Sequence, residues 1–346
     1  MEKLRIGMIG CGQIMPATAK GILGGENCQM VRLLDIDPVA LGETKDKYGV
    51  AAENDLFALL YDDEIEAVYI AIPHALHAAV AVEALRAGKH VMIEKPMATT
   101  PGDAHFIVAE ADKSGKTAGV AMSQRFTACV EKARELIKKG AIGDISSTHI
   151  RELGFKVENY WSNGVGGTAR RSTWRAFQGM AGGGILIMNA VHFLDSMYYM
   201  TGLTPKSAFA LGGTYRAPAA VEDSISVLLS YAESNAYGVC EAMSSAFGAY
   251  EIDNGSYIYG TKGTIRIIRR ELSLCTSVEG MGVPTGSFQV IPVEDNSDRA
   301  LLMDDFANAC RTGGKPRIPV EDGALITGTI CAAYRSLVSG RPEEVI

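Results

Sequence analysis

The sequence predicts an α/β fold, with a doubly wound parallel sheet in residues 1–122 and a second domain with an antiparallel sheet in residues 123–346. The chain has 346 residues, enough for about two domains with a core each. Over residues 1–120, short apolar segments alternate with helical patterns, which is typical of a parallel sheet between two layers of helices. Later segments alternate polar with apolar residues, which indicates antiparallel strands with one buried face.

The composition excludes several classes of protein. Hydrophobic residues make up 47% of the chain and charged residues 21%, which are values of an ordinary globular protein. The net charge of −7 argues against nucleic acid or an anionic membrane as partner, because like charges repel. No segment has the pattern of a signal peptide or a membrane span. Seven cysteines cannot all pair, so reduced thiols and a cytoplasmic location are expected.

Five strands are predicted in the first domain, at residues 4–9, 30–34, 67–72, 90–93 and 117–122. Helices are predicted over residues 76–87, closed by Gly88, and over residues 103–113. Asp37 is expected to cap the helix that follows the second strand. Ligands of such sheets bind beyond the carboxyl ends of the strands. The residues that fall at this edge include Gly10, Asp35, Pro73 and Lys95.

A glycine loop follows the first strand, at Gly10-Cys11-Gly12. Backbone amides of such a loop and the N-terminus of the next helix can bind a pyrophosphate. Met15 stands where a third glycine is usual, so the loop alone is also compatible with an ordinary turn. Asp35 ends the second strand, near the roughly 20-residue spacing of a ribose-binding acid. Because this carboxylate would repel a 2′-phosphate, the sequence predicts a Rossmann domain that binds NAD in preference to NADP.

Three segments resemble one family of enzymes. They are Ala67–His77 with its continuation to the Glu94-Lys95-Pro96 run, the stretch from Gly182-Gly-Gly184 to His192 and Asp195, and the turn Gly260–Thr264. Together with the glycine loop they resemble the Gfo/Idh/MocA family of sugar and polyol dehydrogenases over nearly the whole chain. The resemblance implies a Rossmann domain followed by an α+β domain with a large, mostly antiparallel sheet, and a homodimer or homotetramer.

The resemblance implies that Lys95 and His192 are the catalytic residues. Lys95 would lie beside the nicotinamide and hydrogen-bond the reacting oxygen, and burial can lower the pKa of a lysine toward useful proton transfer. His192 would donate or accept a proton, because imidazole titrates near neutrality. Asn189 and Asp195 share a helix face with His192, so Asn189 is expected to orient the substrate and Asp195 to orient His192. The Lys95–Pro96 bond is expected to be cis.

One position departs from the family pattern. Many members carry a carboxylate four residues before the histidine, and this chain has Met188 there. Because a methionine cannot transfer a proton, the proton path is expected to use Lys95 and His192, with Asn189 as a hydrogen-bond partner.

Further site residues are predicted by position. The cofactor site is expected to comprise Gly10, Cys11, Gly12, Gln13, Ile14, Asp35, Ile36, Ile72, Pro73, His74, His77, Glu94, Lys95, Pro96, Gln124, Trp174 and Arg175. The substrate site is expected to comprise Lys95, Arg125, Tyr160, Trp161, Asn189 and His192. For the aromatic pair Tyr160-Trp161, stacking on a sugar face and ordinary packing both remain open. No metal site is expected, since His74 and His77 lack cysteine or acidic partners nearby.

In the second domain, strands are predicted at residues 224–231, 236–245 and 265–268. Ile225, Val227, Leu229 and Tyr231 fall on one face of the first of them and would be buried under helices. The opposite face of the sheet is predicted to join subunits.

The predicted function is NAD-dependent hydride transfer to or from a hydroxyl-bearing carbon of a sugar, glycoside or polyol. Two alternatives remain open. One is a glycoside lyase or glycosidase that oxidises a sugar ring transiently and recycles its NAD. The other is a non-catalytic regulator that senses NAD.

Overall fold

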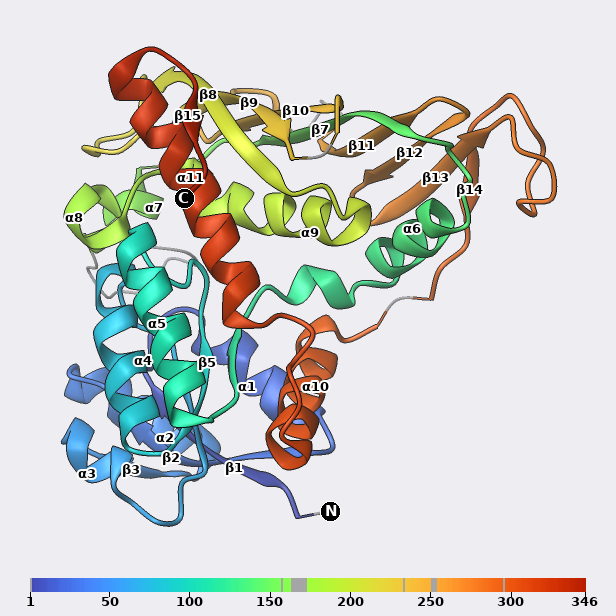
Figure 1. The fold of residues 1–346 in the computed structure, drawn as a ribbon. Coiled ribbons are helices and arrows are strands. Elements are labelled where there is room, and N and C mark those ends of the chain that lie inside the picture. Colours follow the sequence, from blue (N-terminus) through green and yellow to red (C-terminus); the bar gives the residue numbers. More distant parts are fainter. Residues whose placement is uncertain (1, 157, 163–172, 233, 250–253, 295) are drawn as a thin grey trace.

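The computed structural model describes residues 2–156, 158–162, 173–232, 234–249, 254–294 and 296–346, and its two domains are stacked one above the other (Figure 1). The first contains a six-stranded sheet in the order β3-β2-β1-β4-β5-β6, and every pairing in it is parallel. Its strands are β1 (Leu4–Ile9), β2 (Cys28–Leu34), β3 (Ala51–Glu53), β4 (Ala67–Ile70), β5 (His90–Ile93) and β6 (Ala118–Val120). The predicted doubly wound sheet is therefore confirmed, and β3 is a short edge strand that the sequence analysis did not predict.

Helices cover the parallel sheet. They are α1 (Met15–Gly24), α2 (Pro38–Tyr48), α3 (Leu56–Leu60), α4 (His77–Arg86) and α5 (Pro101–Ser114). Local signals define their ends as predicted: the Asp37 carboxylate accepts hydrogen bonds from two amides of the first turn of α2. Gly88, with φ at +77°, follows the last residues of α4, a backbone conformation that a residue with a Cβ rarely adopts.

The second domain is built on a nine-stranded sheet in the order β14-β13-β12-β11-β7-β10-β9-β8-β15. Only the pair β7–β10 is parallel among the described strands, so the sheet is mostly antiparallel, as predicted. The strands are β7 (Ile145–Leu153), β8 (Pro205–Gly213), β9 (Ser224–Tyr231), β10 (Tyr237–Met243), β11 (Gly255–Gly260), β12 (Gly263–Ile268), β13 (Glu271–Thr276), β14 (Gln289–Ile291) and β15 (Glu343–Glu344).

One face of this sheet is covered by α6 (Ala128–Lys138), α9 (Val191–Thr201) and α11 (Val320–Ser339), and the described residues place no helix on the other face (Figure 1). The predicted alternation of β9 is confirmed, since Ile225, Val227, Leu229 and Tyr231 are all buried. Shorter helical segments on the same side are η2 (Ser123–Phe126), α7 (Asn159–Ser162), η3 (Trp174–Ala176), α8 (Gln178–Ala181) and the π-helical turn η4 (Leu186–Ala190).

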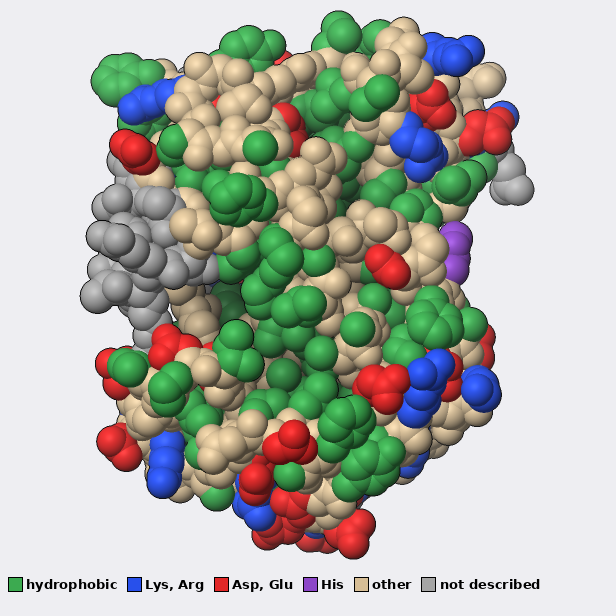
Figure 2. All heavy atoms as spheres, turned by 90° about the vertical axis from the view of Figure 1, so that its left-hand side faces the viewer, with side chains coloured by type: hydrophobic (Ala, Val, Ile, Leu, Met, Phe, Trp, Pro, Cys, Tyr) green, Lys and Arg blue, Asp and Glu red, His purple; other side chains and the backbone are tan. Residues whose placement is uncertain are grey.

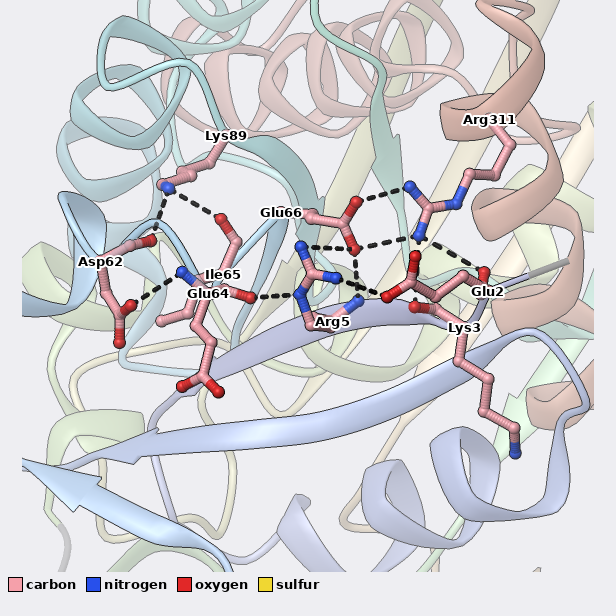
Figure 3. Close-up of polar contacts among 9 residues, drawn as sticks. All are labelled: Glu2, Lys3, Arg5, Asp62, Glu64, Ile65, Glu66, Lys89 and Arg311. Carbon is pink, nitrogen blue, oxygen red and sulfur yellow. Dashed lines mark hydrogen bonds and ion pairs between the residues drawn. The ribbon is translucent and has the colours of Figure 1, made fainter.

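The helix α10 (Asp298–Thr312) follows the second sheet in the chain but packs on α1 of the first domain (Figure 1). Asp304 accepts hydrogen bonds from the backbone amides of Glu26 and Asn27, just before β2. Arg311 reaches Glu66, at the start of β4, and Figure 3 shows its guanidinium facing that carboxylate. The predicted division at residue 122 therefore separates the two sheets, whereas α10 is part of the first domain in space.

An apolar strip runs along the side of the molecule formed by α3, α4, α5 and α8. Figure 2 shows hydrophobic side chains gathered across the middle of this side, between the two domains. Leu76, Phe106 and Phe177, on or next to α4, α5 and α8, have exposed side chains. None of the helices formed by the described residues combines the length and apolar character needed to cross a membrane.

Candidate active site

The glycine loop is shaped by close contact with β4 and by Asp35. A Cβ on Gly10 would lie 2.2 Å from the carbonyl oxygen of Ala71, whereas a Cβ on Gly12 would meet nothing within 4 Å. The loop therefore presents open backbone at Gly12, where a pyrophosphate can approach. Asp35 accepts a hydrogen bond from the amide of Cys11 at 2.6 Å, so the acid that is expected to bind ribose also holds the loop.

The surroundings of Asp35 suit an adenosine. Ile36 is fully exposed, although it follows the buried end of β2, and offers an apolar surface beside the carboxylate. Gln13 and Ile14 are half-buried in the turn that leads into α1, and Met15 is buried where a third glycine is usual. These residues fit a dinucleotide, because an open loop, an acid and an exposed apolar side chain lie together at the carboxyl ends of β1 and β2.

The Glu94-Lys95-Pro96 turn follows β5, and its Lys95–Pro96 bond is cis, as expected. Glu94 was expected to contact the cofactor, but it is buried. Its carboxylate accepts hydrogen bonds from the hydroxyl of Tyr69 at 2.7 Å and from Arg299 of α10 at 3.2 Å. We therefore correct its role, since Glu94 anchors the turn from inside the protein.

His77 also differs from the expectation. It is completely buried, with Nδ1 2.8 Å from the carbonyl oxygen of Pro96 and Nε2 2.9 Å from that of Ile72. Burial lowers the pKa of His77, so it is a neutral link between two turns and not a cofactor contact. The position of a histidine in sequence cannot reveal such partners, because both are backbone atoms of other segments.

Lys95 follows β5 at the carboxyl edge of the parallel sheet. Its Nζ donates a hydrogen bond to the backbone carbonyl of Met188 at 2.8 Å. Burial, helped by the positive charges of Arg299 and Arg175, lowers the pKa of Lys95 to about 8. At position 188, where the family pattern expects a carboxylate, the backbone carbonyl of Met188 accepts the hydrogen bond from Lys95. With a pKa of about 8, Lys95 can exchange a proton near neutral pH.

His192 lies one turn beyond Met188, in the first turn of α9. The preceding η4 segment is a π-helical turn, in which the amide of Val191 bonds the carbonyl oxygen of Leu186, five residues earlier. The Nδ1 of His192 is buried and meets no hydrogen-bond partner within the described part of the chain. Burial and the charge of Lys95 lower the pKa of His192 well below its usual range, so the ring is neutral at pH 7.

Two predicted roles around His192 are wrong. Asp195 does not orient His192; it is fully buried and accepts hydrogen bonds from Nε of Arg125 at 2.9 Å and from Nη2 at 2.5 Å. Arg125, which was expected in the substrate site, is only 2% exposed and also contacts Asp322 at 2.6 Å. The desolvation of a guanidinium is offset only by such direct pairing, so this group is part of the core.

Asn189 and Tyr160 are brought together. The hydroxyl of Tyr160 donates a hydrogen bond to Oδ1 of Asn189 at 3.1 Å, next to the sulfur of Met188. Trp161 is 2% exposed and packs edge-on against Tyr160, with ring centroids 5.1 Å apart. Trp161 is therefore packed inside the protein and does not stack on a sugar. For Tyr160, stacking on a sugar stays a prediction.

The remaining predicted cofactor residues lie around the same edge. Trp174 packs edge-on against His74 at 4.5 Å, and the guanidinium of Arg175 lies over the Trp174 ring. His74 is buried, with Nδ1 2.8 Å from the carbonyl oxygen of Ala181. Ile72 and Pro73 are half-buried at the end of β4, and Gln124 accepts a hydrogen bond from Ser196. No group of three or more potential metal ligands occurs among the described residues.

Sequence reasoning missed the support of the histidine helix. Glu222 accepts hydrogen bonds from the amides of Gly184 and Leu186 and from the hydroxyl of Tyr334. A Cβ on Gly184 would lie 1.7 Å from the carbonyl oxygen of Glu222, and one on Gly183 would overlap the Tyr334 hydroxyl at 2.2 Å. The glycines are thus required by close packing, and a glycine triplet before a helix is the signal that points to a buried partner.

Comparison with known proteins places the chain in a family. Residues 4–122 match the model of an oxidoreductase family with an NAD-binding Rossmann fold, and residues 130–266 match the Gfo/Idh/MocA C-terminal domain. The chain belongs to this family. It is an NAD(P)-dependent oxidoreductase whose relatives include sugar and polyol dehydrogenases.

Individual relatives are distant. A 1-carboxy-3-chloro-3,4-dihydroxycyclohexa-1,5-diene dehydrogenase of Comamonas testosteroni is 37% identical over 147 residues, but the match spans only 42% of this chain and 37% of that protein. D-glucoside 3-dehydrogenase of Escherichia coli is 26% identical over 99% of this chain and 97% of its own length. The structure of levoglucosan dehydrogenase with NADH superposes with a TM-score of 0.87 and 23% identity, covering all of both chains.

Proposed function

We propose that the protein transfers a hydride between the nicotinamide of NAD and a hydroxyl-bearing carbon of a sugar, glycoside or polyol. The observation that carries this proposal is Lys95, a half-buried lysine at the carboxyl edge of the Rossmann sheet, whose Nζ binds the backbone carbonyl of Met188 and whose pKa is lowered to about 8. The likeness over nearly the full length to D-glucoside 3-dehydrogenase supports the choice of substrate class.

The bound dinucleotide would supply the hydride acceptor or donor, and the chain's own residues handle the proton. The carbonyl oxygen of Met188 accepts a hydrogen bond from one N–H of Lys95. The remaining hydrogen-bonding positions of the amino group would face the substrate hydroxyl. In its neutral form Lys95 accepts the hydroxyl proton during oxidation, and in its charged form it returns the proton during reduction. His192 lies one turn beyond Met188, and its neutral ring would hydrogen-bond a second hydroxyl group of the substrate.

NAD is the expected cofactor in preference to NADP. The Asp35 carboxylate would accept hydrogen bonds from ribose hydroxyls and would repel a 2′-phosphate. Fluorescence titration should give a lower dissociation constant for NADH than for NADPH. Equal or reversed affinities would contradict this choice.

A screen of NAD reduction over polyols, sugars and glycosides at alkaline pH tests the activity. Lys95→Ala should lower turnover of an active substrate by about 10²- to 10⁴-fold, the usual contribution of acid–base catalysis, and should leave the dissociation constant of NADH unchanged. Unchanged turnover in this variant would refute the role of Lys95. Release of an aglycone without net NADH would favour the lyase or glycosidase, and NAD binding without any oxidation would favour the regulator.

The uncovered face of the nine-stranded sheet is proposed to join two subunits. Leu228 and Tyr237 are about half exposed on this face, and the Tyr257 and Tyr259 rings stack there at 6.3 Å. An exposed surface of this apolar character is typical of an interface between subunits. Light scattering at micromolar concentration should give a dimer or tetramer, and a monomer mass would refute the proposal.

A further inference from the structure

One arginine of α10 reaches the turn that carries Lys95. Arg299 lies in the first turn of α10, and its Nη1 donates a hydrogen bond to Oε1 of Glu94 at 3.2 Å. The Glu94 side chain is only 6% exposed and that of Arg299 21%. Gly21 of α1 leaves room for this approach, because a Cβ there would lie 2.9 Å from the Cβ of Arg299. A helix that follows the second sheet in the chain therefore brings a positive charge to the Glu94-Lys95-Pro96 turn.

The carboxylate of Glu94 connects Arg299 to the main chain of Lys95. Its Oε1 also accepts a hydrogen bond from the Tyr69 hydroxyl at 2.7 Å, and its Oε2 accepts one from the backbone amide of Lys95 at 3.2 Å. The other end of Lys95 is held by the carbonyl oxygen of Met188, at 2.8 Å from Nζ. The backbone and the amino group of Lys95 are therefore both fixed, and the backbone contact depends on the carboxylate that Arg299 binds.

Arg299 acts on the proton equilibrium of Lys95 in two ways, and both have the same sign. Its charge repels a second positive charge on Lys95, and its pairing with Glu94 weakens the attraction of that carboxylate for the ammonium form. Burial has the largest effect and lowers the pKa of Lys95; the charge of Glu94 raises this pKa and the charge of Arg299 lowers it. A guanidinium keeps its charge at every pH at which an enzyme works, so the effect of Arg299 is permanent.

We propose that Arg299 is a positioning residue of the active site, which holds the Glu94 carboxylate and by its charge keeps part of Lys95 neutral near pH 7, ready to accept the proton of a substrate hydroxyl. It acts through Glu94 and Lys95 and sets the pH range in which the enzyme oxidises its substrate. The inference rests on the proposed function, because it takes Lys95 as the residue that transfers the proton.

Other charged or titratable groups also face Lys95. They are Arg175 of η3, Lys156 after β7, and the histidines His74, His77 and His192. Burial lowers the pKa of each histidine, so all three rings are neutral at pH 7. Burial also raises the pKa of the Tyr69 hydroxyl that faces Glu94, which therefore stays protonated. These groups are present in every variant below, so a difference between the variants comes from Arg299 or Glu94.

The test compares Arg299→Gln with the wild type and with the matched control Arg311→Gln. Both arginines lie on α10 and pair with a carboxylate of the first domain. Arg311, however, contacts Glu66 at the start of β4, the amino edge of the parallel sheet, whereas Lys95 lies at the carboxyl edge (Figure 3). Arg299→Gln should move the pH profile of kcat/KM about one unit to higher pH, as expected for the loss of a nearby charge. Arg311→Gln should keep the profile of the wild type.

The direction of the change separates this role from a merely structural one. With a pKa of about 8 in the wild type, a displacement of one unit lowers kcat/KM for oxidation about 8-fold at pH 7.5 and leaves it nearly equal at pH 10. Reduction needs the charged form of Lys95 and should become about threefold faster at pH 8.5. A damaged fold would slow both directions at every pH. Arg299→Lys, which keeps the charge, should retain most of the wild-type profile, and Glu94→Gln should move it to lower pH.

The pKa of Lys95 can also be measured without turnover, from the pH dependence of its acetylation by acetic anhydride, followed by mass spectrometry of the peptides. It should be higher in Arg299→Gln and unchanged in Arg311→Gln. An unchanged pKa in Arg299→Gln, or an equal rise in both variants, would overturn the role of Arg299. If the melting temperature shows that Arg299→Gln does not fold, Glu94→Gln decides, and a pKa that is not lowered there overturns the role.

The two measurements also separate this inference from the proposed function. A wild type that oxidises a sugar, together with a pKa of Lys95 that does not respond to Arg299, contradicts only the inference. A pKa that responds as expected, in a protein that oxidises no sugar or polyol, contradicts the proposed function and leaves the effect of Arg299 on Lys95 in place.

Discussion

Two arginines of the second domain, Arg125 and Arg175, are surrounded by side chains in different ways. In one group, Arg125 contacts Asp195 directly, with the closest atoms 2.5 Å apart, and Asp322 completes the pairing. In the other group, the guanidinium of Arg175 lies over the rings of Trp174 and Tyr160, and the Tyr160 hydroxyl donates a hydrogen bond to Oδ1 of Asn189. The first group pairs its guanidinium with two carboxylates, whereas among the described residues Arg175 pairs with none.

The difference lies in how each guanidinium is compensated. A buried ion pair in direct contact compensates the desolvation of its members and offers nothing to a ligand. A guanidinium that lies over aromatic rings keeps its N–H groups for other partners. By sequence alone both arginines were candidates for the site, and only their partners tell them apart.

The largest effect is expected from breaking the direct pair. Asp195→Asn leaves the buried Arg125 with a weaker partner, and the free energy of unfolding should fall by about 3–5 kcal/mol. Urea denaturation followed by circular dichroism measures this loss. Glu135→Gln, which neutralises an exposed acid beside Lys132 and Lys139, is the control and should change stability by less than about 1 kcal/mol. Equal losses of stability in the two variants would contradict the distinction between the buried and the exposed ion pairs.

A smaller effect, on activity, is expected from removing the Tyr160 hydroxyl. Tyr160→Phe keeps the ring and removes the hydroxyl that donates to Oδ1 of Asn189. Loss of one such hydrogen bond costs about 0.5–1.5 kcal/mol, so kcat/KM for the sugar should fall about 2- to 13-fold. Steady-state kinetics measures KM and kcat/KM for the sugar, and thermal unfolding measures the stability of the variant. A large loss of stability without a change in KM would place Tyr160 with the structural cluster.

The smallest effect concerns the pH profile. Oxidation needs neutral Lys95, whose pKa is about 8, so kcat/KM for oxidation should rise about threefold from pH 7.5 to 8.5. Reduction needs the charged form and should fall over the same range. Initial rates in both directions provide the measurement, and profiles that change in the same direction would show that another group controls them.

Much of the fold was predictable because its signals are local. The glycine loop, Asp35 at the end of β2, the caps at Asp37 and Gly88 and the alternation of β9 each depend on a few neighbouring residues. The second sheet and the position of Lys95 came from the family resemblance, and the parallel and antiparallel sheets and the cis bond that it implied are confirmed.

The errors concern partners that are distant in sequence. Arg125 meets Asp195 and Asp322, and His77 meets two backbone carbonyls, so neither is free for a ligand. Such contacts are set by tertiary packing, which a pattern within one segment does not contain.

The return of α10 to the first domain has a consequence for synthesis on the ribosome. The strands β1 to β6 are complete once residue 120 has been made, yet the surface of α1 that α10 covers waits for residues 298–312. At the usual 5–20 residues per second this delay is roughly 10–40 s. During that interval the surface of α1 that α10 will cover stays exposed, and it is covered only after nearly the entire second domain has been made.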